Sequence, residues 1–323
     1  MQLYSLSLGG GDNRGDKKKM SKKSIEIAAD EKFCANCGVT EIDEIKLKPC
    51  DKCDLVSNCS DECQLNHEEV HEIACKERAA ELRDEILFKQ PESSHLGDCP
   101  ICFLPMPLDK NLTSMQFCCS KLICLGCYYA NSVRAIEKRL KQQCPFCRKN
   151  LPKTDDEIKK NLEKRVEKND TVALREIGLR KRSEGDYYSA YEYLSRSAAL
   201  GDVVAMYNLS LMHHYGHGVE RDEERARYYL DKAAISGDVE ARYFLGLSEV
   251  EKRRYDRAAK HWIISSKLGH VKSIKRLKDF YKAGYFVSKD DFALALRAHK
   301  AAVNATKSPQ REAAEKFFSK RDQ

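Results

Sequence analysis

The cysteines of this chain stand in closely spaced pairs, which is the spacing typical of zinc ligands. All fifteen lie between Cys34 and Cys147, and the 176 residues that follow contain none. Five pairs are CxxC, one is CxxxC, and one is adjacent. The remaining cysteine, Cys75, follows His71 by four positions. Together with His71 they provide sixteen ligands, which predicts four tetrahedral zinc ions as the cofactor. The predicted ligands are Cys34, Cys37, Cys50, Cys53, Cys59, Cys63, His71, Cys75, Cys99, Cys102, Cys118, Cys119, Cys124, Cys127, Cys144 and Cys147.

The rest of the sequence favours metal over disulfides. An odd number of cysteines does not suit a disulfide framework, whereas a cysteine–histidine metal set accommodates fifteen. The N-terminal segment lacks the apolar core of a signal peptide, and no stretch approaches the roughly 18 apolar residues of a membrane span. We therefore expect a cytoplasmic or nuclear protein that does not contact membranes.

The charge balance argues against nucleic acid as a partner. The formal net charge is +7, but fifteen thiolates add −15 and four zinc ions add +8, so the metallated chain is close to neutral. No basic helix with interleaved aromatic residues accompanies either cysteine cluster. The clearest run of lysines lies within residues 1–30, which read as a disordered basic arm, with nuclear targeting as the alternative.

The first cysteine cluster, residues 34–75, is too short for a hydrophobic core of its own, so zinc would have to stabilise it. The run from Cys63 through His67 and His71 to Cys75 resembles a MYND finger. That resemblance implies two interleaved zinc sites, one formed by Cys34, Cys37, Cys59 and Cys63 and the other by Cys50, Cys53, His71 and Cys75. It also places His67 outside the ligand set. Glu68 stands where the family has a tryptophan, so peptide capture and a purely structural role both remain open.

The second cluster, residues 96–150, resembles an all-cysteine RING domain. It opens with Cys99-Pro-Ile-Cys102 and closes with Cys144-Pro-Phe-Cys147-Arg148. The resemblance implies two cross-braced sites: Cys99, Cys102, Cys124 and Cys127 form one, and Cys118, Cys119, Cys144 and Cys147 form the other.

A RING that acts as a ubiquitin ligase orients a charged ubiquitin-conjugating enzyme and performs no covalent chemistry itself. By resemblance, Ile101, Pro145 and Phe146 would contact the conjugating enzyme. Arg148 would bridge it to ubiquitin, for which the fixed fork of a guanidinium is suited. The alternative is that these residues only pack locally or carry a surface charge. Asn131 stands where such domains often have tryptophan or leucine, which counts against ligase activity.

Two helical segments connect these parts. Residues 76–91 form a predicted helical linker that ends at a proline. Residues 151–169 form a linker helix, opened by a capping box of Thr154 and Glu157.

Residues 170–306 are repetitive. The pairs Asn169–Asp170, Gly201–Asp202, Gly237–Asp238 and Gly269–His270 recur at intervals of 32, 36 and 32 residues, a period typical of a helical solenoid. Residues 205–238 resemble a Sel-one-like repeat, a relative of the tetratricopeptide repeat. The family's leucine–glycine pair is Leu245–Gly246 in the next unit, and residues 307–323 read as a polar tail.

The predicted fold class is therefore multi-domain: two small zinc-stabilised modules followed by an all-α helical-repeat solenoid. The leading hypothesis is a RING-type ubiquitin ligase whose partners are a ubiquitin-conjugating enzyme, ubiquitin and an unidentified protein bound by the repeats. The alternative is a non-catalytic interaction scaffold. A small-molecule enzyme is disfavoured, since the sequence has neither a phosphate loop nor a nucleophile–base motif.

Overall fold

The computed structural model describes residues 34–37, 39, 41, 46–53 and 56–320. The predicted basic arm over residues 1–30 lies outside these residues. The chain forms two compact units, one ending at Leu82 and the other beginning at Arg83. Within the described residues, no helix combines the length and the apolar character needed to cross a membrane.

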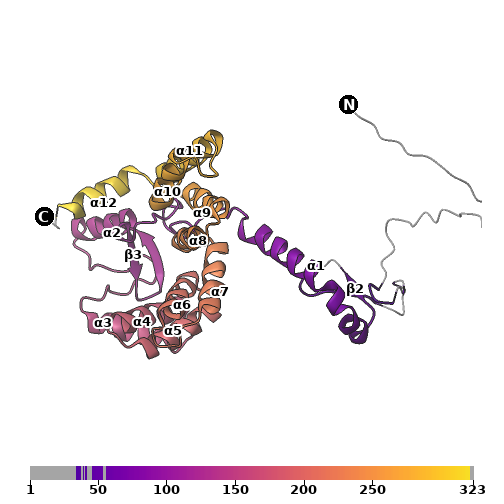
Figure 1. Cartoon of the computed structure of the whole chain (residues 1–323). Helices are drawn as coiled ribbons and strands as arrows, with labels where there is room; N and C mark the ends of the chain where they lie inside the picture. Colours follow the sequence, from indigo (N-terminus) through magenta and orange to yellow (C-terminus); the bar gives the residue numbers. More distant parts are fainter. Residues whose placement is uncertain (1–33, 38, 40, 42–45, 54–55, 321–323) are drawn as a thin grey trace, which may run out of the picture. The chain divides into compact units, whose positions relative to one another are not determined.

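The first unit is built on a short hairpin and a helix (Figure 1). Strand β1 (Lys48–Pro49) pairs antiparallel with β2 (Ser57–Asn58). Helix α1 (Asp61–Leu87) follows. Acidic residues in its first turn interact favourably with the positive end of the helix dipole. It carries His71 and Cys75 four residues apart, on one face.

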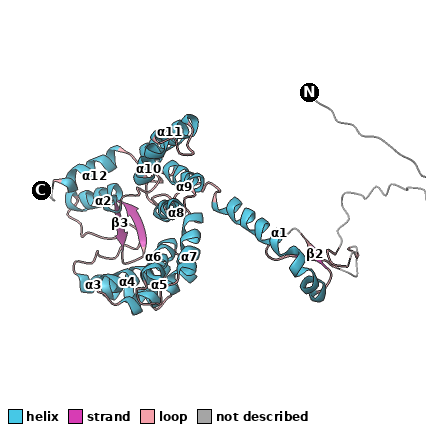
Figure 2. Ribbon diagram, viewed as in Figure 1, coloured by secondary structure: helices cyan, strands magenta, loops and turns pink. Residues whose placement is uncertain are grey.

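The second unit begins with the end of α1 and contains the second cysteine cluster. A 3-10 turn, η1 (Lys110–Leu112), leads into β3 (Thr113–Gln116). This strand pairs antiparallel with β4 (Lys121–Cys124), and helix α2 (Leu125–Glu137) follows directly (Figure 2). The side chain of Cys124 caps α2 by accepting from the Cys127 amide.

Helical hairpins make up most of the second unit, and each helix packs against its sequence neighbour. This arrangement confirms the prediction of zinc modules followed by a solenoid. The hairpins pair α4 with α5, α6 with α7, α8 with α9, and α10 with α11. Their bounds are α4 (Thr171–Ser183), α5 (Tyr187–Ala199), α6 (Val203–Tyr215), α7 (Glu223–Ile235), α8 (Val239–Glu251), α9 (Tyr255–Lys267), α10 (Val271–Lys282) and α11 (Lys289–Ala305).

The recurring sequence pairs are the joints between these hairpins. Gly201, Gly237 and Gly269 have φ values of 90°, 89° and 94°, a left-handed conformation that glycine adopts without steric cost. The next residue caps the following helix: Asp202 and Asp238 each accept a hydrogen bond from the amide three positions on. Each joint therefore ends one helix and starts the next.

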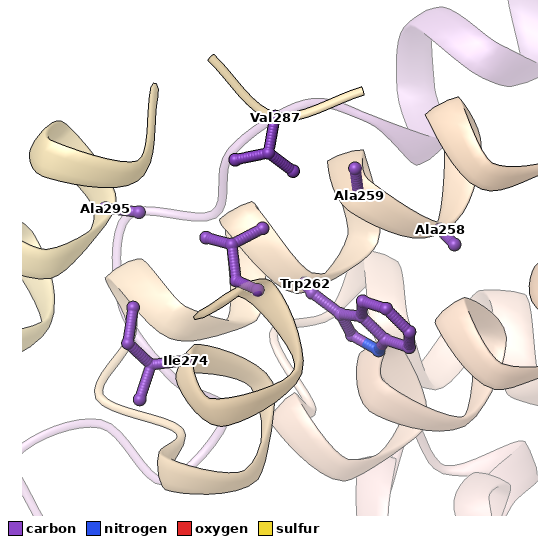
Figure 3. Close-up of a cluster of buried hydrophobic side chains, with 7 residues drawn as sticks. Ala258, Ala259, Trp262, Ile274, Val287 and Ala295 are labelled. Carbon is purple, nitrogen blue, oxygen red and sulfur yellow. The ribbon is translucent and has the colours of Figure 1, made fainter. Parts of the chain in front are cut away.

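Small residues let the two helices of a hairpin approach closely. A Cβ atom on Gly246 of α8 would lie 2.3 Å from Nε1 of Trp262 on α9. Trp262 is buried and anchors a cluster that extends into the last hairpin (Figure 3). Its indole N–H donates to the Tyr243 carbonyl at 3.2 Å, so the buried polar atom is satisfied.

Two further helices bracket the repeats. Helix α3 (Asp155–Val166) is capped by Thr154, which accepts from the Glu157 amide, as the capping box predicts. The predicted polar tail instead contains α12 (Pro309–Ser319), which packs against α2 of the zinc module (Figure 1). The chain thus leaves the zinc module before the repeats and returns to it after them, through α12.

The segment between the two cysteine clusters packs on the repeats. Leu87 is fully buried in a cluster with residues of α7 and α8. The buried Arg242 donates to the Leu87 carbonyl and, at 3.4 Å, to that of Lys89. Arg257 pairs with Asp84. The predicted linker over residues 76–91 therefore ends as a docked part of the second unit.

A pair of glycine substitutions should measure how the segment just after this linker, residues 93–95, packs against the joint at Gly237. Gly201→Ala should cost about 1–2 kcal/mol of unfolding free energy, because the left-handed backbone strains any Cβ. Open space surrounds that site. Gly237→Ala should cost more, since its Cβ would also lie 2.8 Å from the Ser93 carbonyl and 3.1 Å from the His95 amide.

Urea unfolding of the full chain checks both variants. Gly201→Ala is the matched control for backbone strain alone. Equal losses at the two positions would contradict the docking of residues 93–95 against the joint.

Candidate functional site

The structure brings the sixteen predicted ligands together in four groups of four. In each group the candidate ligand atoms all lie within 4.8 Å of one another. The groups coincide with those implied by the two resemblances. They are Cys34/Cys37/Cys59/Cys63, Cys50/Cys53/His71/Cys75, Cys99/Cys102/Cys124/Cys127 and Cys118/Cys119/Cys144/Cys147.

The sulfur separations fit zinc. A Zn–S bond of about 2.3 Å in a tetrahedron places neighbouring sulfurs roughly 3.8 Å apart, whereas a disulfide needs about 2.05 Å. All fifteen cysteines are free. The sulfur pairs Cys37–Cys59, Cys50–Cys75 and Cys102–Cys124 are separated by 3.5, 3.7 and 3.8 Å. These sites therefore have the spacing of a shared metal ion.

The electrostatics of the group of Cys34, Cys37, Cys59 and Cys63 also call for a cation. Burial raises the pKa of Cys34, but hydrogen bonds from the backbone at Cys37 and Cys59 outweigh it and lower the pKa to about 6. The Cys59 amide donates to the Cys34 sulfur at 3.4 Å. Within the same group, hydrogen bonds with Cys37 and Cys63 raise the pKa of Cys59 to about 12. Four thiolates this close can all be ionised only around a positive ion.

Histidines 67 and 71 have different surroundings, although both lie on α1. Nε2 of His71 is 3.1 Å from the Cys53 sulfur, inside its group. His67 lies outside every group and stacks on the His71 ring at 5.6 Å between centroids.

The second module contains two zinc-binding turns of the same form. Phe103 follows Cys102 with φ of 56°, and Arg148 follows Cys147 with φ of 57°. In both turns the amide of this residue donates to the carbonyl of the first cysteine, at 2.8 Å to Cys99 and 3.1 Å to Cys144. Such a backbone is uncommon for residues other than glycine. The hydrogen-bonded backbone of each turn thus fixes the position and direction from which the side chains of Phe103 and Arg148 leave the chain.

The predicted enzyme-contact residues differ in exposure. Ile101 is 38% exposed, and Pro145 and Arg148 are also exposed. Phe146 is half-buried and packs on the hydrophobic cluster of the module, so most of its surface stabilises the fold. Asn131 donates to the Gln143 carbonyl at 2.9 Å and ties α2 to the segment before Cys144.

A residue far along the chain, missed by the sequence analysis, reaches one of the four groups. Arg311 of α12 donates to the Cys102 sulfur at 3.3 Å. Its neighbour Gln310 lies 3.5 Å from the Cys127 sulfur. The only local signal was Ser308–Pro309, a cap followed by proline at the first helical position, which predicts a helix but not its contacts.

The geometry describes a zinc-finger and helical-repeat protein, and comparison with known families agrees. Residues 34–75 match the MYND finger family, and residues 176–202 and 203–238 match the Sel1 repeat family. The chain therefore contains a MYND finger and Sel1 repeats, which confirms the MYND and the Sel-one-like resemblances. Sel1 repeats are protein-interaction platforms. No curated protein matches the chain.

Two solved structures are similar to parts of the chain. A Sel1 repeat protein from Oxalobacter formigenes is 29% identical, with a TM-score of 0.42 over 48% of this chain and 66% of the other. A protective antigen of uropathogenic Escherichia coli with an SLR fold is 20% identical, with a TM-score of 0.39 over 51% of this chain and 37% of the other. The match thus spans less than two thirds of either relative.

Metal counting should separate ligands from neighbours. Native mass spectrometry of protein purified without chelator should show four zinc ions. His71→Ala and Cys119→Ala should each shift the count to three, because each leaves its group with three ligands.

His67→Ala is the matched control and should retain four ions. A wild-type count of two would contradict one of the modules. A fourth ion retained by Cys119→Ala would show that the adjacent pair does not supply two ligands.

Proposed function

We propose that residues 96–150 act as a RING-type module and that the protein is a ubiquitin ligase. The supporting observation is the interleaving of two metal groups along the chain. Cys99 and Cys102 group with Cys124 and Cys127, and the intervening Cys118 and Cys119 group with the final pair. The hairpin of β3 and β4 and the helix α2 lie between the two turns, so both turns are braced on one small framework.

The chemistry required of this framework is orientation. A charged conjugating enzyme holds ubiquitin through a flexible thioester linkage, and restraining it in a reactive pose lowers the entropic part of the barrier. Arg148 suits a bridging role because its backbone is held by the turn while its side chain is exposed. A guanidinium presents several donors in a fixed plane, which suits two acceptors at once.

An apolar surface is available for the enzyme to dock on. Ile101 and Phe103, in and after the first turn, are 38% and 76% exposed. A shallow groove of mixed character runs between α2 and the second turn, lined by Ala135, Leu140 and Pro145 together with the charged Arg134, Lys141 and Arg148. Exposed apolar side chains at turns this rigid favour a partner surface over simple packing.

A non-catalytic scaffold remains the second candidate, and Asn131 favours it. Its amide is used within the module, in the bond to Gln143, where a large apolar side chain would extend the docking surface. In this reading the MYND finger, the second module and the Sel1 repeats each bind proteins, and no ubiquitin is transferred.

Two substitutions should separate docking from orientation. Ile101→Ala should weaken binding of a conjugating enzyme by about tenfold or more, as expected for a central apolar contact. Both metals of the module should stay bound, since Ile101 is not a ligand. Arg148→Ala should leave docking largely intact and slow discharge of the ubiquitin thioester about tenfold or more, because it removes an interaction made in the reactive pose.

The assay follows ubiquitin discharge from a panel of charged conjugating enzymes with full-length, fully metallated protein. Arg148→Lys should retain part of the activity. Lys149→Ala, an exposed charge at the next position, is the matched control and should behave as wild type. Wild-type protein that accelerates discharge from no enzyme of a broad panel would decide for the scaffold.

A further inference from the structure

Arg311 is a buried cation without an acidic partner. Its residue is 8% exposed, and within the described part of the chain no carboxylate forms an ion pair with it. Burying an unpaired guanidinium is costly unless other groups replace its hydration. The surroundings of Arg311 must therefore supply the compensating negative charge.

The two Nη groups of Arg311 donate to the first turn of the second zinc module and to the end of α11, whereas its buried Nε has no hydrogen-bond partner among the described residues. Nη1 donates to the carbonyls of Pro105 and Thr306 at 2.7 and 2.8 Å. Nη2 donates to the Leu104 carbonyl at 3.1 Å and to the Cys102 sulfur at 3.3 Å. One guanidinium thus binds the backbone after Cys102 and the sulfur itself.

A metal at this centre would supply the missing counter-charge. Four thiolates around a divalent zinc ion carry a net charge of −2, and burial strengthens their attraction to a cation. Hydrogen bonds to ligand atoms also hold those atoms in place for the metal. In the neighbouring group of Cys118, Cys119, Cys144 and Cys147, no arginine or lysine side chain of the described residues donates a hydrogen bond to a ligand sulfur. The two centres of the module therefore differ.

The packing of α12 is built for this contact. A Cβ atom on Gly126 of α2 would lie 2.8 Å from Cγ and 3.0 Å from Cα of Arg311, so the absence of a side chain there lets α12 approach. Further along the same helices, Phe318 packs on Tyr128 and Tyr129, with ring centroids 6.3 and 6.2 Å apart. Figure 1 shows α12 lying alongside α2.

We propose that Arg311, assisted by Gln310, secures the metal centre of Cys99, Cys102, Cys124 and Cys127. In this role the C-terminal helix holds the ligand sulfurs through hydrogen bonds and balances their charge without touching the metal. Zinc retention at one centre then depends on a distant helix, since Arg311 lies 209 positions after Cys102 in the sequence. The inference does not depend on ubiquitin transfer.

The test measures zinc release from the full-length protein to an excess of a chromogenic chelator, with native mass spectrometry at timed intervals. Arg311→Met keeps most of the side-chain volume and removes the charge and the donors. One of the four zinc ions should leave about tenfold faster or more, as expected when a partner of a metal ligand is lost. Arg311→Lys should fall between this variant and wild type.

Two other variants complete the design. Lys316→Met removes an exposed charge from the same helix and should release zinc as wild type does. Gly126→Ala should resemble Arg311→Met, because it pushes α12 away without removing a polar group. If Arg311→Met does not fold, Gln310→Ala carries the test, and one ion should still leave severalfold faster.

Two results would overturn the proposal. One is wild-type release of all four ions from Arg311→Met, or from Gln310→Ala where it replaces that variant. The other is equal acceleration of both ions of the second module, which would indicate general loosening of the fold.

Discussion

The shared coordination of one cation by four side chains is the constraint on which both small modules depend. Segments of about 40 to 50 residues bury too little apolar surface to fold by packing alone. Here the sulfurs stand at the spacing that zinc needs, and backbone amides such as that of Cys59 point at them. The β-hairpins of both modules are short because they only have to deliver ligands. In the second module the same constraint fixes the backbone of Phe103 and Arg148, so the exposed surface inherits its geometry from the metal groups.

The repeats depend on a different principle. A left-handed glycine ends one helix, the next residue caps the following helix, and the helices between these joints pack closely in pairs. This principle is local, and it repeats wherever glycine and aspartate recur. It is joined to the zinc module by contacts that are not local. Arg165 of α3 donates to Ser120 beside the second metal group at 2.7 Å, and Arg311 donates to the Cys102 sulfur in the first turn. Arg242 donates to the carbonyl of Leu87, at the end of α1, and so holds the segment that leads into the module. The module and the solenoid therefore form one folded unit, although their sequences look independent.

This difference explains what the sequence could and could not predict. Cysteine spacing and family resemblance indicated four metal groups, and the recurring Gly–Asp pairs indicated the joints of the hairpins. Both signals are visible in the sequence because each consists of pairs of residues no more than a few positions apart. No such local pattern in the sequence indicates the docking of residues 83–95 or the contact of Arg311 with the metal group. A buried arginine bound to carbonyls looks, in sequence, like any surface arginine. Phe146 illustrates the same limit: its position between two cysteines suggested a partner contact, while the fold uses much of it as core.

The return of α12 to the zinc module also sets an order of events during synthesis. The four cysteines of the first turn and of α2 leave the ribosome before any repeat exists, and a domain can fold as its chain emerges. The metal centre can therefore assemble early, but the arginine that lies against it is made only after all of the repeats. Until then the Leu104 and Pro105 carbonyls and the Cys102 sulfur lack the hydrogen bonds that Arg311 donates in the folded chain. Synthesis of α12 thus changes a metal centre that lies about two hundred positions earlier in the chain, and a nascent chain without α12 differs at that centre from a chain that contains it.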